Sequence, residues 1–370
     1  MKIMLRPFLP ITPGEILDEE LETRGWSQGD LAVVLGRPVQ AVNEIINGKK
    51  AIAPETAIAL SQALGTSAEY WLNLESSYRL DLLHQRDGKN SADVERRARL
   101  FTKVPLKELV RLSWIDADLE NLDQAEAAVC RFLEIDSMED ESRVSFAARR
   151  TGTHAPHSEA QVAWVCQVRH LARTLKAGKY SRDELADAAL SLSKLSASEK
   201  TFRGLPIVLA DLGIRFVVAP HLAGTKIDGA ALWLDEASPV VAVSFRYDRM
   251  DWFWFTLMHE IAHIVAGDGL KKPMIDQALV GKDADATGLA AVESKADRAA
   301  SAWLVPSDKM SSFVRRTKPY YSRGSILQFA STLGVHPAIV VGQLQKRGEI
   351  PCTHHRNLLV KVRHLVAMIK

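Results

Sequence analysis

The stretch FTLMHEIAHIVAGD, Phe255 to Asp268, sets two histidines and a glutamate in an otherwise apolar segment. His259 and His263 are four residues apart, so on an α-helix both imidazoles lie on one face and can meet at one point. There they can bind Zn²⁺, while Glu260 beside them can take a proton from the water that attacks a carbonyl. The alternative is a buried helix with incidental histidines, so a third ligand has to decide between the two interpretations.

A catalytic zinc site uses three protein ligands. The residue six positions beyond His263 is Gly269, which excludes the zinc-peptidase class with a third histidine there. The later segment ESKAD holds Glu293 and Asp297 four residues apart on one helix face. Glu293 can bind zinc, and Asp297 can accept a hydrogen bond from the far nitrogen of a liganding histidine. The alternative for this pair is a solvated charged face.

Stabilisation of the oxyanion has several candidates in the sequence. Zinc itself can supply it as a Lewis acid. The other candidates are His221, Arg246, Tyr247 and His336, and each also has a structural interpretation. For Arg246 that interpretation is an ion pair with a carboxylate near the end of a strand.

The pattern of apolar residues changes near residue 200 and sets the fold class. Before it, apolar residues recur at three- and four-residue steps; after it, GIRFVVAP, GAALWLD and VVAVSFR predict three strands, the last two forming a hairpin. We therefore expect a mainly α protein with a small β-sheet, an α+β fold. Its expected parts are a helix-turn-helix domain (1–83), a helical middle region (84–200) and a zinc peptidase domain with a C-terminal helical extension (201–370).

The N-terminal part predicts five short helices, the first beginning at a capping box from Thr12 to Glu15. SQGDLAVVLGRPVQAVNEIINGKK has the layout of a helix-turn-helix, with a glycine in the turn and a basic loop at the end. Amide and guanidinium groups on the second helix can read base edges, and the lysines after it can contact phosphates. The candidate DNA contacts are Arg37, Gln40, Asn43, Lys49 and Lys50.

The net negative charge of this N-terminal part weakens the expected affinity for DNA. Residues 1–75 hold six Lys or Arg and ten Asp or Glu, so affinity from phosphate neutralisation should be modest and strongly salt-dependent. The acids cluster on the first helix, which need not face DNA. The alternative is a helical protein-interaction module that keeps only the fold.

Composition and targeting signals point to the cytoplasm. The three cysteines, Cys130, Cys166 and Cys352, form no CxxC pair, which fits a reducing compartment. The N-terminal segment has no long apolar region or cleavage pattern of a signal peptide, and no apolar run approaches the ~20 residues of a membrane span. We expect no membrane association.

The motif region resembles a known family. DWFWFTLMHEIAHIVAGD followed by ESKADRAASAWLVP is similar to the ImmA/IrrE zinc metallo-endopeptidases, over roughly residues 200–350. The resemblance implies His259, His263 and Glu293 as zinc ligands and Glu260 as general base. Relatives cleave or inactivate a partner repressor, often under stress or phage induction. Asp297 stands where many relatives carry asparagine, and either residue can accept the hydrogen bond.

The N-terminal helices resemble a second family. The stretch from TPGEILDEELETRGWSQGD through AEYWLNLESSYRL is similar to HigA-type antitoxins of the lambda-repressor-like helix-turn-helix family, over nearly all of residues 12–80. The resemblance implies a homodimer that binds an inverted-repeat operator, commonly for autoregulation.

Together the two resemblances predict a DNA-binding regulator fused to a zinc endopeptidase that cleaves a repressor or antitoxin. Two alternatives remain. One is a non-catalytic, antitoxin-like regulator whose zinc is structural or sensory. The other is a protein that neutralises a toxin by binding it, which would show a small co-purifying partner.

Overall fold

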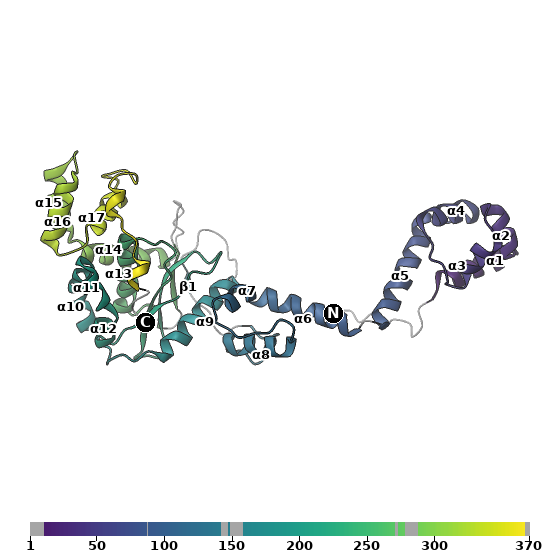
Figure 1. The fold of residues 1–370 in the computed structure, drawn as a ribbon, viewed down its shortest axis with the longest axis horizontal. Coiled ribbons are helices and arrows are strands. Elements are labelled where there is room, and N and C mark those ends of the chain that lie inside the picture. The colour runs from purple at the N-terminus through teal and green to yellow at the C-terminus, as the bar shows by residue number, and fades with distance from the viewer. Residues whose placement is uncertain are drawn as a thin grey trace. The chain divides into compact units, whose positions relative to one another are not determined.

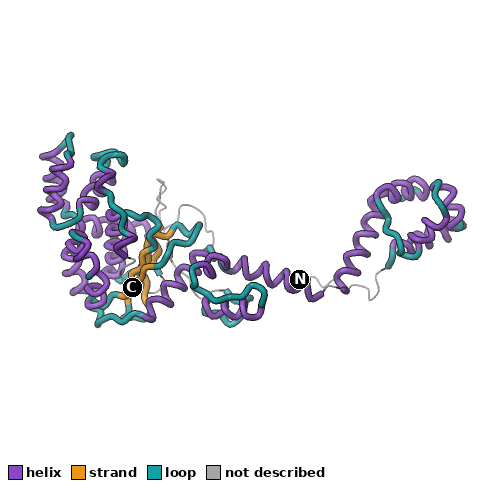
Figure 2. The backbone as a smooth tube through the Cα atoms, viewed as in Figure 1, coloured by secondary structure: helices purple, strands orange, loops and turns teal. Residues whose placement is uncertain are grey.

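The computed structural model describes residues 11–86, 88–141, 147–148, 158–270, 273–277 and 288–366 of the chain. The chain divides into two compact units, Met1–Ala98 and Arg99–Lys370 (Figure 1). The mainly helical content with one sheet confirms the predicted fold class (Figure 2).

The first unit is a helical bundle closed around one core. Its first two helices begin at Thr12 and Ser27, each of which forms a capping box, and both end at a left-handed glycine. Leu31, Val42 and Trp71 are among the buried residues that hold the bundle together. The helices are α1 (Pro13–Arg24), α2 (Gln28–Leu35), α3 (Val39–Ile46), α4 (Pro54–Leu64) and α5 (Ala68–Arg86).

At Gly14 the backbones of α1 and α3 lie close together. A Cβ atom on Gly14 would lie 2.1 Å from the carbonyl oxygen of Ile46, which is backbone and cannot rotate away. We expect Gly14→Ala to destabilise the first unit by about 2 kcal/mol or more, because the helices must separate. Gly29→Ala in α2 is the matched control: it meets only Ser27 Oγ at 3.5 Å, so its effect should stay within about 1 kcal/mol. Denaturant-dependent hydrogen exchange of residues 11–86 measures both, and equal protection in the two variants would contradict the packing argument.

The second unit is built on a five-stranded sheet with the strand order β1-β5-β3-β4-β2. β3 and β4 form the predicted antiparallel hairpin, and β2 pairs parallel with β4. β5 pairs antiparallel with β3 and parallel with β1, two short strands that the sequence did not predict. The strands are β1 (Ala147–Ala148), β2 (Arg215–Val218), β3 (Ile227–Trp233), β4 (Pro239–Val243) and β5 (Met274–Gln277).

Both faces of the sheet are covered by helices, because apolar side chains point out of both faces. Ala231 and Val241 point into a core shared with α13, whereas Ala230 and Ala242 point into a second core shared with α8 and α9. The helices involved are α7 (Leu106–Arg111), α8 (Leu122–Leu133), α9 (Glu159–Thr174), α10 (Arg182–Leu192), α11 (Glu199–Arg203), α12 (Leu205–Asp211), α13 (Met250–Ala266) and α14 (Gly288–Leu304).

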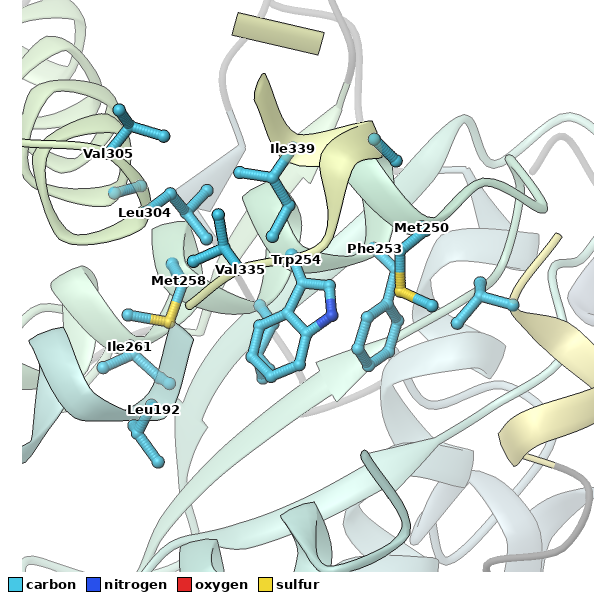
Figure 3. Packing of buried hydrophobic residues seen from close by; sticks show 14 of the residues in the cluster. Leu192, Met250, Phe253, Trp254, Met258, Ile261, Leu304, Val305, Val335 and Ile339 are labelled. Carbon is cyan, nitrogen blue, oxygen red and sulfur yellow. The ribbon is translucent and has the colours of Figure 1, made fainter. Parts of the chain in front are cut away.

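The core on the α13 face is dense and rich in aromatic residues. Trp254 and Met258 of α13 are fully buried and lie beside Leu304 and Ile339 (Figure 3). Ile339 belongs to the C-terminal helices, which complete this face. The remaining elements are α6 (Gly88–Lys103), α15 (Ser307–Thr317), α16 (Arg323–Leu333), α17 (Pro337–Lys346), α18 (Arg363–Val366) and the 3₁₀ turns η1 (Ser193–Ala197) and η2 (Arg356–Leu358).

The predicted middle region does not form a compact unit of its own. Val129 of α8 and Trp164 of α9 pack in the same core as Val217 and Val240 of the sheet, and the Trp164 indole donates a hydrogen bond to the Pro220 carbonyl at 3.1 Å. The physical reason is that the sheet face opposite α13 is also apolar, and α8 and α9 shield it from water. The compact units accordingly divide between Ala98 and Arg99 instead of near residues 83 and 200.

Within the described ranges, no single helix has both the length and the apolar composition of a membrane span. The bent pair α16 and α17, at 112° to each other, passes that test only when the two are taken together.

Candidate metal centre and helix-turn-helix surface

Helix α13 carries the two histidines and Glu260 in its buried second half. It ends at Gly267, whose left-handed backbone turns the chain sharply back after His263. His259 and His263 are each 1% exposed and Glu260 is fully buried. The ring nitrogens His259 Nε2 and His263 Nε2 lie 3.0 Å apart, so both imidazoles point at the same spot, as their four-residue spacing requires.

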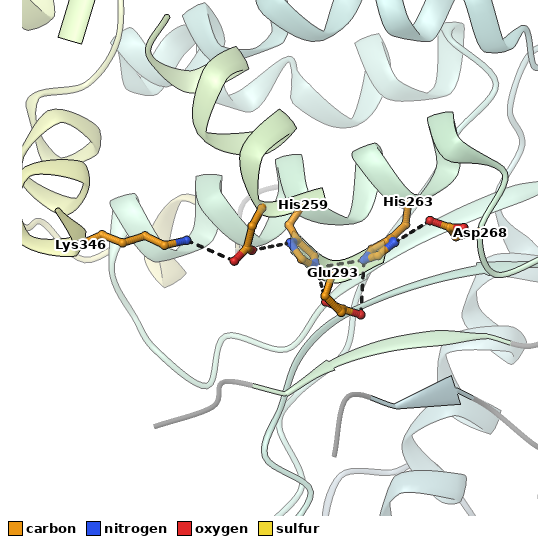
Figure 4. Close-up of polar contacts among 6 residues, drawn as sticks. His259, His263, Asp268, Glu293 and Lys346 are labelled. Atoms are coloured by element: carbon orange, nitrogen blue, oxygen red, sulfur yellow. Dashed lines mark hydrogen bonds and ion pairs between the residues drawn. The ribbon is translucent and has the colours of Figure 1, made fainter. Parts of the chain in front are cut away.

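Glu293 on α14 is the third residue at this spot (Figure 4). One of its carboxylate oxygens lies 3.2 Å from His259 Nε2 and the other 3.7 Å from His263 Nε2. Burial works to raise the pKa of the Glu293 carboxyl, but the two imidazoles outweigh it and lower the pKa to about 2. This buried carboxylate is therefore charged at neutral pH.

A carboxylate holds each histidine from its far side. Asp297 on α14 lies 3.0 Å from His259 Nδ1, and Asp268, just after α13, lies 3.0 Å from His263 Nδ1. Each Nδ1 can therefore donate its proton to the carboxylate behind it, which would leave the Nε2 lone pair for a metal ion. Sequence reasoning proposed Asp297 but missed Asp268; the signal was a carboxylate five residues after His263, directly behind the glycine that ends the helix.

The donor set fits a zinc ion. Zinc with nitrogen and oxygen ligands at about 2.0–2.1 Å in a tetrahedron separates the ligand atoms by about 3.3–3.4 Å. The ligand atoms of His259, His263 and Glu293 all lie within 4.8 Å of one another. Two Nε2 lone pairs and a carboxylate turned to one point in a buried site would repel unless a cation lay between them. The residues present therefore suit a divalent cation with nitrogen and oxygen ligands.

Replacing Asp268 tests whether its contact with His263 strengthens zinc binding. We expect Asp268→Ala to raise the Kd for zinc by about 10- to 100-fold, because His263 loses the acceptor that fixes its tautomer and ring orientation. Asp308→Ala, at an exposed position in the first turn of α15, should leave the Kd unchanged. Competition with a fluorescent chelator measures both affinities. Equal affinity in the Asp268 variant and the wild type would remove Asp268 from the site.

Lys346 extends the network outwards from Asp297. Its ammonium group lies 3.5 Å from Asp297 Oδ2 and 3.9 Å from the centroid of the Phe255 ring. Figure 4 shows Lys346 at the outer end of the row of polar contacts. Both contacts place a positive charge beside the carboxylate that holds His259. The last residue of α17 thus touches the outer edge of the candidate metal centre.

Gly229 on β3 forms the wall against Glu260. A Cβ at Gly229 would lie 2.6 Å from Glu260 Oε1 and 2.6 Å from Thr256 Cγ2. The missing side chain is therefore what leaves room for the Glu260 carboxylate between α13 and the sheet. No sequence pattern pointed to Gly229, because the contact joins residues from a strand and a helix.

The four candidate oxyanion helpers each have a structural partner. Arg246 pairs with Asp228 at 3.5 Å, which confirms the expected ion pair near a strand end. His221 Nδ1 lies 3.3 Å from Thr225 Oγ1, and Tyr247 packs on the Trp252 ring. His336 caps α17 by accepting the backbone N–H of Ala338. Burial lowers the pKa of both His221 and His336.

The predicted DNA contacts lie on α3 and its flanks. Gln40 and Asn43 are exposed: the Gln40 amide donates to Glu44 at 3.2 Å and the Asn43 amide to Gln28 at 3.1 Å. Gln28, at the start of α2, thereby joins this face, which sequence reasoning missed. Arg37 instead donates to Thr56 Oγ1 at 2.7 Å, so part of its guanidinium is held inside the domain. Lys49 and Lys50 are exposed in the turn after α3.

Two family models match the chain. One, described as helix-turn-helix, matches residues 17–71. The other, a peptidase-family model described as the IrrE N-terminal-like domain, matches residues 210–344, which include α13 and the residues of the metal centre. Both resemblances inferred from the sequence are confirmed.

The relatives agree with the first of these models. The HTH-type transcriptional regulator YddM of Escherichia coli is 32% identical over 91 residues, which cover 25% of this chain and 92% of that protein. Antitoxin HigA-1 of Vibrio cholerae is 40% identical over 67 residues, 18% of this chain and 63% of its own length. The solved Pseudomonas aeruginosa antitoxin HigA with the higBA promoter is 39% identical over 22% of this chain and 89% of its own, with a TM-score of 0.21. The chain therefore belongs to the family of helix-turn-helix transcriptional regulators and carries an IrrE N-terminal-like domain in the same polypeptide.

Proposed function

We propose that the second unit is a zinc-dependent endopeptidase. The observation that carries this proposal is the convergence of His259, His263 and Glu293, with their ligand atoms within 4.8 Å of one another, beside the buried carboxylate of Glu260. Two of these donors and the carboxylate come from one helix, and the third donor comes from α14. This arrangement suits hydrolysis of an amide bond by activated water.

Each residue has one task in this mechanism. The three ligands would hold zinc, and Asp297 and Asp268 fix the histidine tautomers so that both Nε2 atoms are free to coordinate. When bound, zinc supplies Lewis acidity that polarises the scissile carbonyl. Glu260 takes a proton from the attacking water and passes it to the departing amine. Gly229 leaves room for the Glu260 carboxylate, which a side chain at this position would displace.

The substrate we propose is a regulatory protein, a repressor or an antitoxin. The support is the fusion of the peptidase-family domain to a helix-turn-helix regulator in one chain, and the likeness of part of the chain to an antitoxin. Comparing the proteomes of cells that carry the wild-type protein or the Glu260→Gln variant tests it. A protein of this class that stays intact only in the variant cells is the expected result, and identical proteomes would contradict the proposal.

The first unit would bind an inverted-repeat operator as a homodimer, with α3 in the major groove. The exposed amides of Gln40 and Asn43, with the half-buried Gln28 beside Asn43, support this, because amides read adenine edges. We expect Gln40→Ala with Asn43→Ala to lower operator affinity by about 10-fold or more. An operator gel shift at several salt concentrations measures it. The matched control is Gln62→Ala on α4, and an unchanged shift in the double variant would contradict this recognition surface.

Burial of the metal centre favours a second function. His259, His263 and Glu293 are each 1% exposed and Glu260 is fully buried, whereas a catalytic site needs access for its substrate. A non-catalytic regulator with structural or sensory zinc accounts for that burial directly. In that case Glu260→Gln leaves the cellular phenotype unchanged while the Gln40 and Asn43 double variant abolishes it.

A further inference from the structure

The C-terminal part of the chain is strongly basic, although the whole chain has a net charge of only +2. Residues 307–366 hold ten Lys or Arg and two acids, Asp308 and Glu349. All ten cationic side chains are exposed. This excess of positive charge creates a local basic surface, because the acids that balance it lie in the rest of the chain.

Two loops of this segment touch each other, and the loops together with the helix ends beside them carry six of the cations. The first loop joins α15 to α16, and the second follows α17. Tyr321 in the first loop donates its hydroxyl to Glu349 in the second at 2.7 Å, and its carbonyl oxygen lies 2.8 Å from His355 Nε2. Gln345 at the end of α17 donates to the carbonyl of His354 at 3.1 Å. We call the surface around these contacts the basic end; its cations are Arg315, Arg316, Lys318, Arg323, Arg347 and Arg356.

The basic end contains a single acid, and that acid is already engaged. Glu349 accepts the Tyr321 hydroxyl and lies 3.3 Å from Lys318 Nζ. Among the residues that the structure describes, none of the five arginines of the basic end forms an ion pair, and the cation that does is Lys318. Five of the six cations thus keep their charge for a partner, which must supply several negative charges.

The arginines and an exposed tyrosine of the basic end indicate that the negative groups of the partner are phosphates. Five of the six cations are arginines, whose planar guanidinium groups match phosphate oxygens in pairs. Tyr320, in the first loop, is 85% exposed, and a tyrosine hydroxyl is a frequent donor to phosphates of a nucleic-acid backbone. A row of phosphates meets several such groups at once, whereas carboxylates of an acidic protein have no comparable regular spacing.

We propose that the basic end binds the phosphate backbone of double-stranded DNA, independently of sequence. It would be a second point of DNA contact, separate from α3, on the unit that carries the metal centre. With α3 on an operator, the second contact becomes intramolecular and raises the overall affinity for DNA around the operator. The contact at the basic end does not depend on the metal centre, on peptidase activity or on sequence reading by α3.

The test uses the full chain and a fluorescein-labelled duplex of arbitrary sequence, about 20 base pairs long, followed by anisotropy between about 50 and 200 mM salt. The variant is Arg315→Gln, Arg316→Gln, Arg323→Gln and Arg347→Gln together. We expect it to reduce the slope of log affinity against log salt by about 3–4, since each phosphate contact contributes about 0.9. At the lower salt concentration we expect the affinity to fall by about 10-fold or more.

The control removes the same number of charges elsewhere on the second unit: Lys176→Gln, Lys179→Gln, Arg182→Gln and Lys200→Gln, all exposed. We expect the control to keep the wild-type slope, and unfolding curves confirm that both variants are folded. An unchanged slope in the basic-end variant, or equal loss in the control, overturns the proposal. The proposal is also overturned if labelled polyglutamate binds as tightly as the duplex, because the surface would then suit acidic proteins. It is likewise overturned if single-stranded DNA binds more tightly than the duplex. The Gln40 and Asn43 double variant should change only the preference for operator DNA over other sequences. A failure of the proposed operator recognition by α3 can therefore be distinguished from a failure of the basic end.

Discussion

Replacing Glu260 by glutamine is expected to lower the rate of substrate cleavage by about 10²- to 10⁴-fold while zinc stays bound. The amide has nearly the shape of the carboxylate, so it fits the space beside Gly229, but it cannot accept the proton of the attacking water. His259, His263 and Glu293 are untouched, so elemental analysis should find the wild-type amount of zinc. Cleavage of the protein identified by the proteome comparison gives the rate.

The matched control for this variant is Glu159→Gln, at an exposed position in the first turn of α9. It makes the same chemical change away from the metal centre and should keep the wild-type rate. If Glu260→Gln cleaves at the wild-type rate, Glu260 is not the general base. If the wild type purified from zinc-supplemented cells contains no zinc, the peptidase proposal itself fails.

Removing the third ligand is expected to have the second largest effect. Glu293→Ala should raise the Kd for zinc by about 10²-fold or more, because one of three donors is lost and the two imidazoles do not replace it. Zinc that binds only the folded protein also raises the melting temperature. We therefore expect added zinc to raise the Tm of the wild type and to leave the Tm of Glu293→Ala nearly unchanged.

Glu293→Gln refines this experiment, because it keeps the size of the side chain and a neutral oxygen donor. Its Kd should lie between those of the wild type and Glu293→Ala. Asp297→Ala should weaken zinc binding less than Glu293→Ala, by about 10- to 100-fold, since Asp297 contacts His259 and not the ligand position itself. A Glu293→Ala protein with wild-type zinc affinity would show that this carboxylate is not a ligand.

Local features of the fold were predictable because they depend on neighbouring residues. Thr12 begins its helix where the predicted capping box placed it, since a cap involves atoms within one turn. The hairpin of β3 and β4 followed from its two apolar runs and the turn between them. Strands β1 and β5 were not predictable: each is at most four residues long, and each exists through pairing with a distant partner.

The amino-acid sequence by itself determined that His259 and His263 share one helix face, because helical geometry sets the distance between residues four apart. It also singled out Glu293 and Asp297 as a pair on a second helix. Only the tertiary structure decided that the two helices bring Glu293 within 3.2 Å of His259, that Asp268 turns back onto His263, and that Gly229 leaves room for Glu260. The physical reason is that distances between elements depend on how α13 packs against α14 and against β3, and residue spacing along one helix carries no information about that packing.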